Sequence, residues 1–277
     1  MRPLSSALIV AGSLAATQVA YAADLPIKAP PVVAPAYNWT GFYVGGNVGG
    51  AWGQTDYELA VPQLFSVVDP AVNLAAAQAG TGSLHPKGFT GGIQAGYNYQ
   101  IQNWVTGLEV DFGAMNLRGS SNFAGTFPLT IQNPFSGSQL SVQTSMNTDW
   151  LFTARGRLGF SPWARTLIYA TGGLAVTRVN YSQTNTYTFL GGVDVETGNL
   201  SQTKTGWTIG GGAEWALWNN QWSVKAEYLY LDFGSVTGQA FIPAIAFTSS
   251  ATSPFVHTAN LNANIARLGL NYKFSSY

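Results

Sequence analysis

The sequence contains no cysteine among its 277 residues, and only 9% of them are Asp, Glu, Lys or Arg. Without thiols the chain has no disulfides, no thiolate nucleophile and no Cys-ligated metal. Soluble domains carry about 25% charged residues, so the low charge content favours a surface that faces something other than water. Basic and acidic residues balance at 12 each, which leaves no basic surface of the kind that binds nucleic acid.

Long hydrophobic runs are also missing. No stretch after the N-terminus reaches the 18 or so consecutive apolar residues of a transmembrane helix. Residues 1–22 combine Arg2, a short apolar run and an Ala20-Tyr21-Ala22 cleavage pattern, which predicts a removed secretory signal peptide. Residues 23–38 contain four prolines and are expected to be an extended periplasmic linker.

What the sequence does contain is a recurring segment of alternating side chains. In residues 104–115, Leu108 and Phe112 share one face while Glu109 and Asp111 share the other, because side chains of a strand alternate between faces. Eight segments have this character: 39–52, 88–100, 104–115, 148–160, 165–181, 205–217, 222–231 and 262–274. The facing of segment 165–181 is ambiguous; we favour Ile168, Leu174 and Val176 outward.

The connections between these segments alternate between long and short, as they do in outer-membrane barrels. We therefore predict an all-β fold for residues 39–277: an eight-stranded antiparallel up-and-down transmembrane β-barrel with short periplasmic turns and both termini in the periplasm. The four long external loops are expected near residues 53–87, 116–147, 182–204 and 233–261, with helical turns at 71–79. The alternative is a soluble β-sandwich or lectin-like barrel.

Tryptophans are sorted by strand end, which favours the membrane barrel. Two aromatic girdles at the lipid headgroups are expected, the periplasmic one from Trp39, Trp104, Trp163, Trp215, Trp218 and Trp222, and the external one from Trp52, Trp150 and Trp207.

Eight charged residues are predicted to point into the lumen: Glu109, Asp111, Arg155, Arg157, Glu214, Lys225, Glu227 and Arg267. One interpretation is an ion path or gate; the other is a structural network of ion pairs. An eight-stranded barrel leaves room only for side chains, and unpaired buried charges are costly, so we favour the structural network.

Candidate chemistry outside the lumen is sparse. His85 and His257, which both fall in predicted external loops, are the only histidines; no nucleophile motif accompanies them, so we expect no enzyme. Hemin capture by these two imidazoles is a weaker hypothesis. Gly-rich stretches at 45–50 and 210–212 lie inside predicted strands without a following helix, so they do not predict a nucleotide site. No catalytic, metal-binding or cofactor-binding residue is assigned.

Several motifs resemble one known family. They are Asn38-Trp39-Thr40-Gly41-Phe42-Tyr43-Val44-Gly45-Gly46, Gly107-Leu108-Glu109, Arg155-Gly156-Arg157-Leu158-Gly159, Tyr169-Ala170-Thr171-Gly172-Gly173-Leu174-Ala175, Gly206-Trp207-Thr208 and Lys225-Ala226-Glu227-Tyr228-Leu229-Tyr230. The chain is similar through these to the small outer-membrane β-barrel proteins of alphaproteobacteria, the porin-family major surface antigens and hemin-binding outer-membrane proteins.

The resemblance implies an abundant surface protein that contributes to envelope integrity, with capture of hemin or another small ligand, or a narrow diffusion pore, as alternatives. The implied partners are outer-membrane lipid, lipopolysaccharide and the barrel assembly machinery, which reads a C-terminal aromatic residue. Here Phe274 is in phase with the last strand, whereas Tyr277 is not.

Overall fold

The computed structural model describes residues 37–60, 70–126, 139–189, 192–218, 220–240 and 255–274, all within the compact unit Ala36–Tyr277. Its elements are β1 (Gly41–Ala60), α1 (Pro70–Ala79), β2 (Gly82–Leu84), β3 (Lys87–Ile101), β4 (Trp104–Thr126), β5 (Gln139–Trp163), β6 (Thr166–Phe189), β7 (Gly192–Ala216), β8 (Trp222–Ala240) and β9 (Phe255–Lys273).

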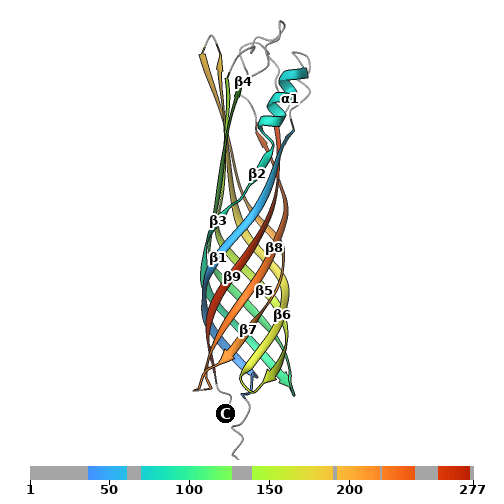
Figure 1. The fold of residues 1–277 in the computed structure, drawn as a ribbon, viewed down its shortest axis with the longest axis vertical. Helices are drawn as coiled ribbons and strands as arrows, with labels where there is room; N and C mark the ends of the chain where they lie inside the picture. Colours follow the sequence, from blue (N-terminus) through green and yellow to red (C-terminus); the bar gives the residue numbers. More distant parts are fainter. Residues whose placement is uncertain are drawn as a thin grey trace, which may run out of the picture. The chain divides into compact units, whose positions relative to one another are not determined.

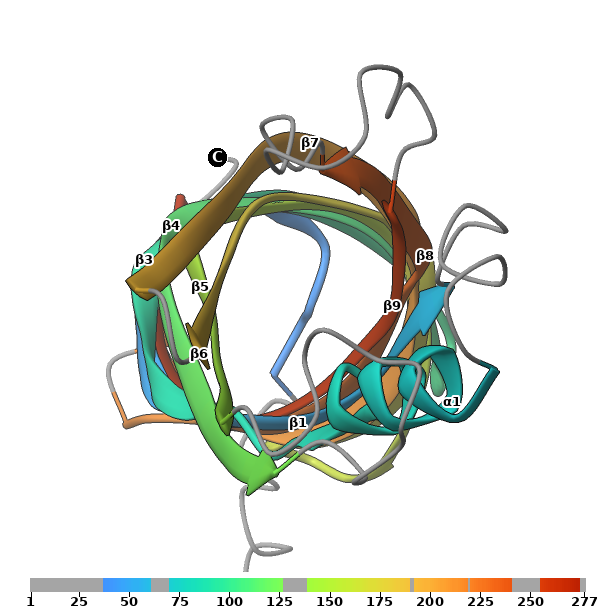
Figure 2. The same ribbon diagram turned by 90° about the horizontal axis from the view of Figure 1, so that it is seen from above.

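Eight long strands close into a barrel, as predicted. Each long strand pairs antiparallel with the next, and β9 pairs with β1, so the sheet forms the ring seen from above in Figure 2. The strands are staggered relative to one another around the barrel. A path of directly paired residues that starts at Tyr43 returns to β1 at Gly53, ten residues further along the strand, by way of Gly96, Glu109, Arg155, Gly173, Thr208, Leu231 and Ala263. This stagger tilts the strands, as closure of a barrel requires.

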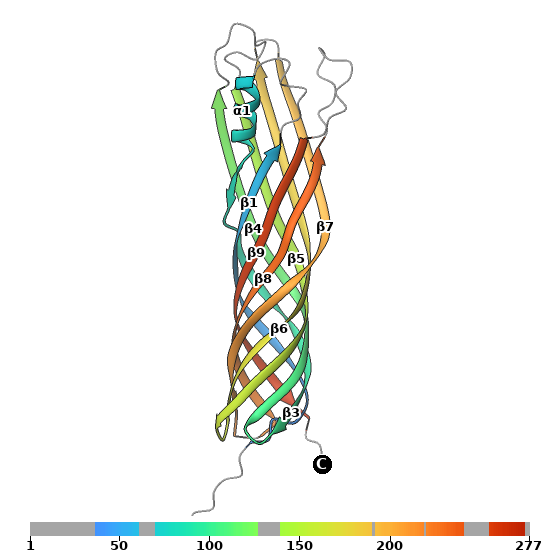
Figure 3. The ribbon, with the colours of Figure 1, turned by 90° about the vertical axis from the view of Figure 1, so that its right-hand side faces the viewer.

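The smaller elements lie around residues 70–84. The predicted helical turns are present as α1, while the three-residue β2, which pairs with residues 55–57 of β1, was not predicted. Figures 1 and 3 place α1 at the end of the barrel where the long strands β1 and β4 finish. Residues 161–163, predicted as part of a turn, continue β5 instead, and the turn is confined to Ala164 and Arg165.

The faces of the strands follow the alternation predicted from the sequence. Phe42, Ile93 and Leu108 are exposed on the outer wall, whereas Tyr43 is buried inside. The ambiguous segment resolves in the favoured sense, because Ile168, Leu174 and the half-buried Val176 lie on the outward parity while Leu167 and Tyr169 are buried in the lumen. On the described residues the outer wall therefore carries an apolar band, and the lumen carries the polar side chains.

The four predicted external loops are too long. Strand structure occupies much of each predicted loop: residues 53–60, 116–126, 139–147, 182–189, 192–204, 233–240 and 255–261 are all in strands. The strands extend because the alternation continues there with its polarity reversed. On β4 the outward side chains change from Phe112 and Ala114 to Asn116 and Arg118, while the inward Met115 and Leu117 are fully buried.

The same reversal occurs on the other strands. The first polar outward residues beyond the apolar band are Gln54, Lys87, Asn116, Asp149, Arg178, Thr205, Asp232 and Asn264. Beyond this level the inside of the barrel is mainly apolar, with a cluster that includes Leu84, Met115, Leu117, Leu151, Val179, Leu229, Leu231, Phe233, Leu261 and Ile265. A few buried polar side chains, such as Gln183 and Asn185, hydrogen-bond to each other there. A cavity of about 10 Å³ within this cluster is no larger than one water. The parts of the strands beyond the apolar band therefore resemble a water-soluble barrel, mainly apolar inside and polar outside.

A β-bulge overturns one predicted facing. Simple alternation along the predicted segment 148–160 places Asp149 on the inward face with Thr153, but Asp149 is exposed on the outer wall and accepts a hydrogen bond from Nδ2 of Asn180 at 2.8 Å. The register between β5 and β6 shifts between Thr148 and Leu151, and both of these side chains are buried inside. The extra residue exchanges the faces of the strand, which keeps the carboxylate of Asp149 out of the apolar cluster.

Trp39 also differs from its prediction. It was assigned to the periplasmic girdle, yet it is 2% exposed and packs inside the barrel end with Tyr37, Val105, Leu167, Tyr169 and Ala216. Of the other tryptophans, Trp150 is half-buried and the remaining seven are exposed. Because the strands are longer than predicted, Trp52 and Trp207 of the external girdle lie inside β1 and β7 rather than at strand ends. Tyr37 was expected in the linker, but its backbone N–H donates to the carbonyl of Ala164 at 2.9 Å and its ring stacks edge-on against Trp39. The predicted signal peptide (residues 1–22) and residues 23–36 of the predicted linker lie outside the described residues.

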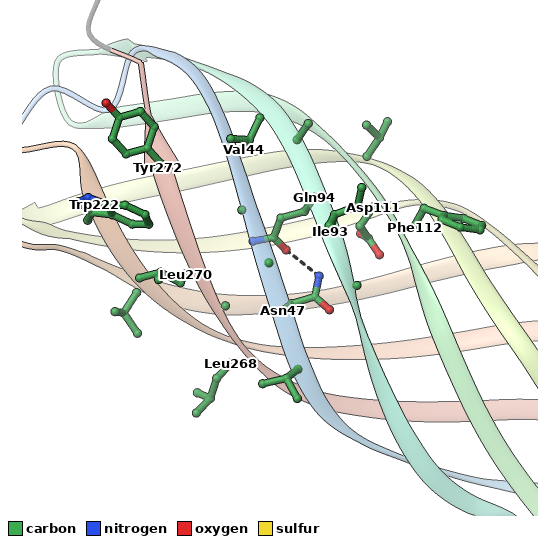
Figure 4. A pocket seen from close by; sticks show the side chains of 18 of the residues that line it. Val44, Asn47, Ile93, Gln94, Asp111, Phe112, Trp222, Leu268, Leu270 and Tyr272 are labelled. Carbon is green, nitrogen blue, oxygen red and sulfur yellow. Dashed lines mark hydrogen bonds between the residues drawn. The ribbon is translucent and has the colours of Figure 1, made fainter.

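The outer wall is hollowed between β9, β1 and β3 by a groove of about 990 Å³ (Figure 4). Val44, Ile93 and Leu270 line it, and the bare backbone of Gly46 gives it depth. The hydrogen bond from Asn47 Nδ2 to Gln94 Oε1, 3.0 Å long, joins two inward side chains of the same strands. The groove therefore belongs mainly to the apolar band.

No helix among the described residues is long and apolar enough to cross a membrane.

Candidate functional site: a charge network in the lumen

All eight charged residues predicted to face inward lie inside the barrel, and each is at most 5% exposed. They come from five strands: β4 supplies Glu109 and Asp111, β5 Arg155 and Arg157, β7 Glu214, β8 Lys225 and Glu227, and β9 Arg267. Their charges are four negative and four positive. The alternation of each strand aims them at the barrel axis, and the narrow ring brings them together.

Two ion pairs follow directly from the register. Glu109 is the direct cross-strand partner of Arg155, and Glu227 that of Arg267. Opposite charges at such positions attract across the strand pair. Glu214 and Lys225 are also register partners, but here the side chains diverge: Lys225 Nζ reaches across the lumen to Glu109, at 2.8 Å from Oε1 and 2.9 Å from Oε2.

Arg155 is the centre of the network. Its Nη2 lies 2.5 Å from Oε1 of Glu109 and 2.8 Å from Oδ2 of Asp111, and its Nη1 lies 3.1 Å from Oε1 of Glu227. Its Nε donates to Oγ1 of Thr153 at 2.9 Å, and that hydroxyl donates to Asp111 at 2.6 Å. One guanidinium thus bridges three carboxylates, the geometry that its planar set of donors suits.

Arg267 closes the other side of the network. Its Nη2 lies 2.6 Å from Oε2 of Glu227, and its Nη1 lies 3.1 Å from Oδ1 of Asp111. Asp111 and Glu227 therefore each contact both Arg155 and Arg267. Each of these two carboxylates is held by more than one cation, which is the arrangement that offsets the desolvation of buried charge.

Arg157 forms the side of the network nearest Trp39. Its Nη2 lies 2.8 Å from Oε2 of Glu214, and its guanidinium carbon lies 4.0 Å from the centre of the Tyr169 ring. Its Nη1 donates to the hydroxyl of Tyr43 at 3.0 Å, and that hydroxyl donates to Glu109 at 2.7 Å. Arg157 Nε and Asn98 Oδ1 are two buried polar atoms without a hydrogen-bond partner.

Several uncharged members of the network were not predicted as site residues. Glu214 accepts hydrogen bonds from Ser223 at 2.5 Å and from Asn271 at 2.9 Å, and Glu227 accepts one from the Tyr169 hydroxyl at 2.9 Å. The sequence signal for these residues was their inward parity, which predicts facing but not height along the axis.

The network lies between two apolar layers. On one side is the cluster around Trp39, and on the other is the apolar cluster of the strand extensions. Burial raises the pKa of the hydroxyl of Tyr37, which precedes the first strand. Polar side chains thus fill the middle of the described barrel, with apolar side chains above and below.

The two histidines lie in different parts of the chain. His85 is exposed in the short connection between β2 and β3. His257 was predicted in an external loop, but its backbone lies in β9, paired with Leu59 and Gly238. Among the described residues no group of three or more His, Asp or Glu side chains could hold a metal ion.

The strands, the apolar band and the inward charges together define a membrane-spanning β-barrel. The particular family is shown by sequence: a model described as the outer membrane protein beta-barrel domain matches residues 6–274, and the chain belongs to this family. It is an outer-membrane protein related to the small outer-membrane proteins of alphaproteobacteria.

Individual relatives agree with this placement. The chain is 34% identical over 262 residues to the 31 kDa outer-membrane immunogenic protein of Brucella melitensis, covering 92% of this chain and 93% of that protein. It is 27% identical to the 22 kDa outer membrane protein of Rhizobium leguminosarum, covering 77% of this chain and 71% of that protein. Among solved structures, Neisserial surface protein A is similar at 13% identity and a TM-score of 0.35, over 85% of this chain and 98% of that chain.

Proposed function

We propose that this protein is a non-enzymatic structural component of the outer membrane: a barrel with a closed lumen that reinforces the envelope and displays its extended strands at the cell surface. The observation that carries the proposal is the lumen network, in which Arg155 alone contacts three buried carboxylates. Charges tied to one another so closely hold the two sides of the barrel together.

The surface role is supported by the printed descriptions of the Brucella relatives as immunogenic outer-membrane proteins. It is also supported by the reversal of polarity along the strands, because a wall with Asn116 and Arg118 outside and Leu117 inside suits water rather than lipid. In this proposal both termini are periplasmic, residues 1–22 are a removed signal peptide, and the outward Phe274 is the aromatic residue that the assembly machinery reads.

Planar-bilayer recording on the refolded protein tests the closed lumen. We expect no steady conductance from the wild type, because the layers of Trp39 and Leu261 lie on either side of the charge network. Steady unitary currents that change when Arg155 or Glu109 is neutralised would replace this proposal with the diffusion pore. The variant Trp218→Ala, altered at a side chain 90% exposed on the outside, controls for effects of substitution alone.

A further inference from the structure

Two cations face each other on the outer wall of the barrel. Lys87 at the start of β3 and Arg118 on β4 are direct register partners, and both side chains are exposed on the outward face. Like charges directly opposite each other on neighbouring strands are destabilising unless an anion lies between them. Among the described residues, neither cation lies within ion-pair distance of an acidic side chain, since the ion pairs of this part of the chain are in the lumen network.

The neighbouring polar groups are already engaged elsewhere. Asp149 on β5 accepts a hydrogen bond from Asn180, and Asp56 on β1 accepts one from the side chain of Gln54 at 3.1 Å. The Nε of Arg118 donates to Oδ1 of Asn116 at 2.6 Å. This contact orients the guanidinium and leaves its terminal nitrogens as donors toward the outside.

The position of Lys87 and Arg118 along the barrel axis indicates which part of the membrane surrounds them. Lys87 is opposite Trp52 of the external girdle, and the next outward residue of β3 is the exposed Phe89. The pair thus lies where the apolar band ends, which is the level at which a lipid exposes its phosphate above its hydrocarbon chains. Below it, the outer wall offers apolar side chains such as Ile93 and the groove of Figure 4.

We propose that Lys87 and Arg118 bind the phosphate of a phosphorylated outer-leaflet lipid, whose acyl chains lie on the apolar wall below the pair. A phosphate offers oxygens to both cations at once and removes their mutual repulsion. Two other cations of the same outer region differ, because neither is directly opposite another cation: Arg178 pairs with Thr203 and Lys204 with Thr177. Lys204 also donates to the Ser235 carbonyl at 2.8 Å. The site rests on the outer-membrane placement of the proposed function, and not on the closed lumen.

The test uses the refolded mature chain in detergent, titrated with lipid A, which carries phosphate monoesters, and followed by calorimetry. We expect Lys87→Gln with Arg118→Gln to weaken the apparent Kd at least about tenfold, because both charge-assisted contacts are lost. The matched control, Arg178→Gln with Lys204→Gln, removes the same charge from the same region. It is expected to change the Kd less than about twofold, whereas non-specific electrostatic attraction of lipid A would weaken equally in both double variants.

Three results would overturn the site: equal loss in the two double variants, unchanged binding in the Lys87/Arg118 variant, or saturable binding of inorganic phosphate without binding of lipid A. Lys87→Glu supplies a variant in which Arg118 gains a cross-strand partner. It should unfold in lipid-free detergent no more easily than the wild type and yet lose lipid A; if it bound lipid A like the wild type, the assignment would be wrong. Bilayer conductance on the same sample reports separately on the lumen, so an open pore with intact lipid A binding would refute only the proposed function.

Discussion

Replacing Arg155 by methionine is the sharpest test of the lumen network. The substitution keeps a long side chain but removes the guanidinium that contacts Glu109, Asp111 and Glu227. Four carboxylates then face three cations in an interior where Arg155 itself is 2% exposed. Breaking a buried ion pair by removing one partner costs about 3–5 kcal/mol. At about 1.4 kcal/mol per factor of ten, the folded population falls by about two to three and a half orders of magnitude relative to the unfolded.

The structure indicates that the loss of stability for Arg155→Met lies in the lower half of that range. Glu109 keeps Lys225 at 2.8 Å, while Asp111 and Glu227 keep Arg267 at 3.1 Å and 2.6 Å. We therefore expect a loss of about 3 kcal/mol, measured by urea unfolding of the refolded protein in lipid vesicles. Arg178→Met, which removes a cation from the outer wall, should change the free energy of unfolding by no more than about 0.5 kcal/mol.

A double-mutant cycle separates the ion pair from packing. Adding Glu109→Gln to Arg155→Met restores charge balance, so the double variant should lose less stability than the sum of the single losses. Strict additivity, or a loss below about 1 kcal/mol for Arg155→Met alone, would refute the view that these charges stabilise the fold.

Three further predictions concern other parts of the chain. Trp39→Ala should cost about 3–5 kcal/mol in the same urea assay, because it empties a buried site, whereas Trp218→Ala, at a side chain 90% exposed, should cost little; equal losses would contradict the inward position of Trp39. Leu261→Asn places an unpaired amide in the apolar cluster of the strand extensions. It should increase proteolysis of the extensions while the membrane part keeps its heat-modifiable gel mobility, whereas the control Asn260→Ser, on the outer face, should not increase proteolysis. Resistance of Leu261→Asn equal to that of the wild type would argue against an apolar interior. Hemin added at micromolar concentration should give no saturable Soret shift; a shift abolished by His85→Ala with His257→Ala would instead establish ligand capture.

The sequence predicted the membrane-facing parts of the strands well, because there one rule applies throughout. On β4 the alternation from Trp104 to Ala114 puts apolar side chains outward and carboxylates inward, and the structure has both. The same parity predicted which charges share the lumen. It did not predict which charges pair, because contacts across the lumen depend on the heights of strands that are not neighbours. Lys225 reaches Glu109 on β4 rather than its register partner Glu214 for this reason.

The predicted loops were too long for a related physical reason. A strand that passes from lipid into water must exchange its apolar and polar faces. The prediction ended each strand at the residue where the outward face becomes polar. On β9, for example, Ala266 is the last small apolar outward residue and Asn264, Asn262 and Asn260 follow it outward. The inward residues of the same stretch are Ile265, Ala263 and Leu261, all buried. An alternation that persists with exchanged polarity is thus a signal of a continuing strand, and it is legible in the sequence.

The exchange of polarity also explains how a barrel with a charged centre can be extended beyond the membrane. Inside the apolar band, lipid covers the outer wall, so the interior can contain charges provided that they pair, as Arg155 and Glu109 do. Beyond the band water covers the outer wall, and burial of apolar side chains such as Leu231 is what mainly holds the opposite sides together. The level of Lys87 and Trp52 is where one source of cohesion replaces the other. Because the outer wall at that level is neither fully apolar nor fully solvated, it is also the place where a charged lipid headgroup can contribute to the stability of the fold.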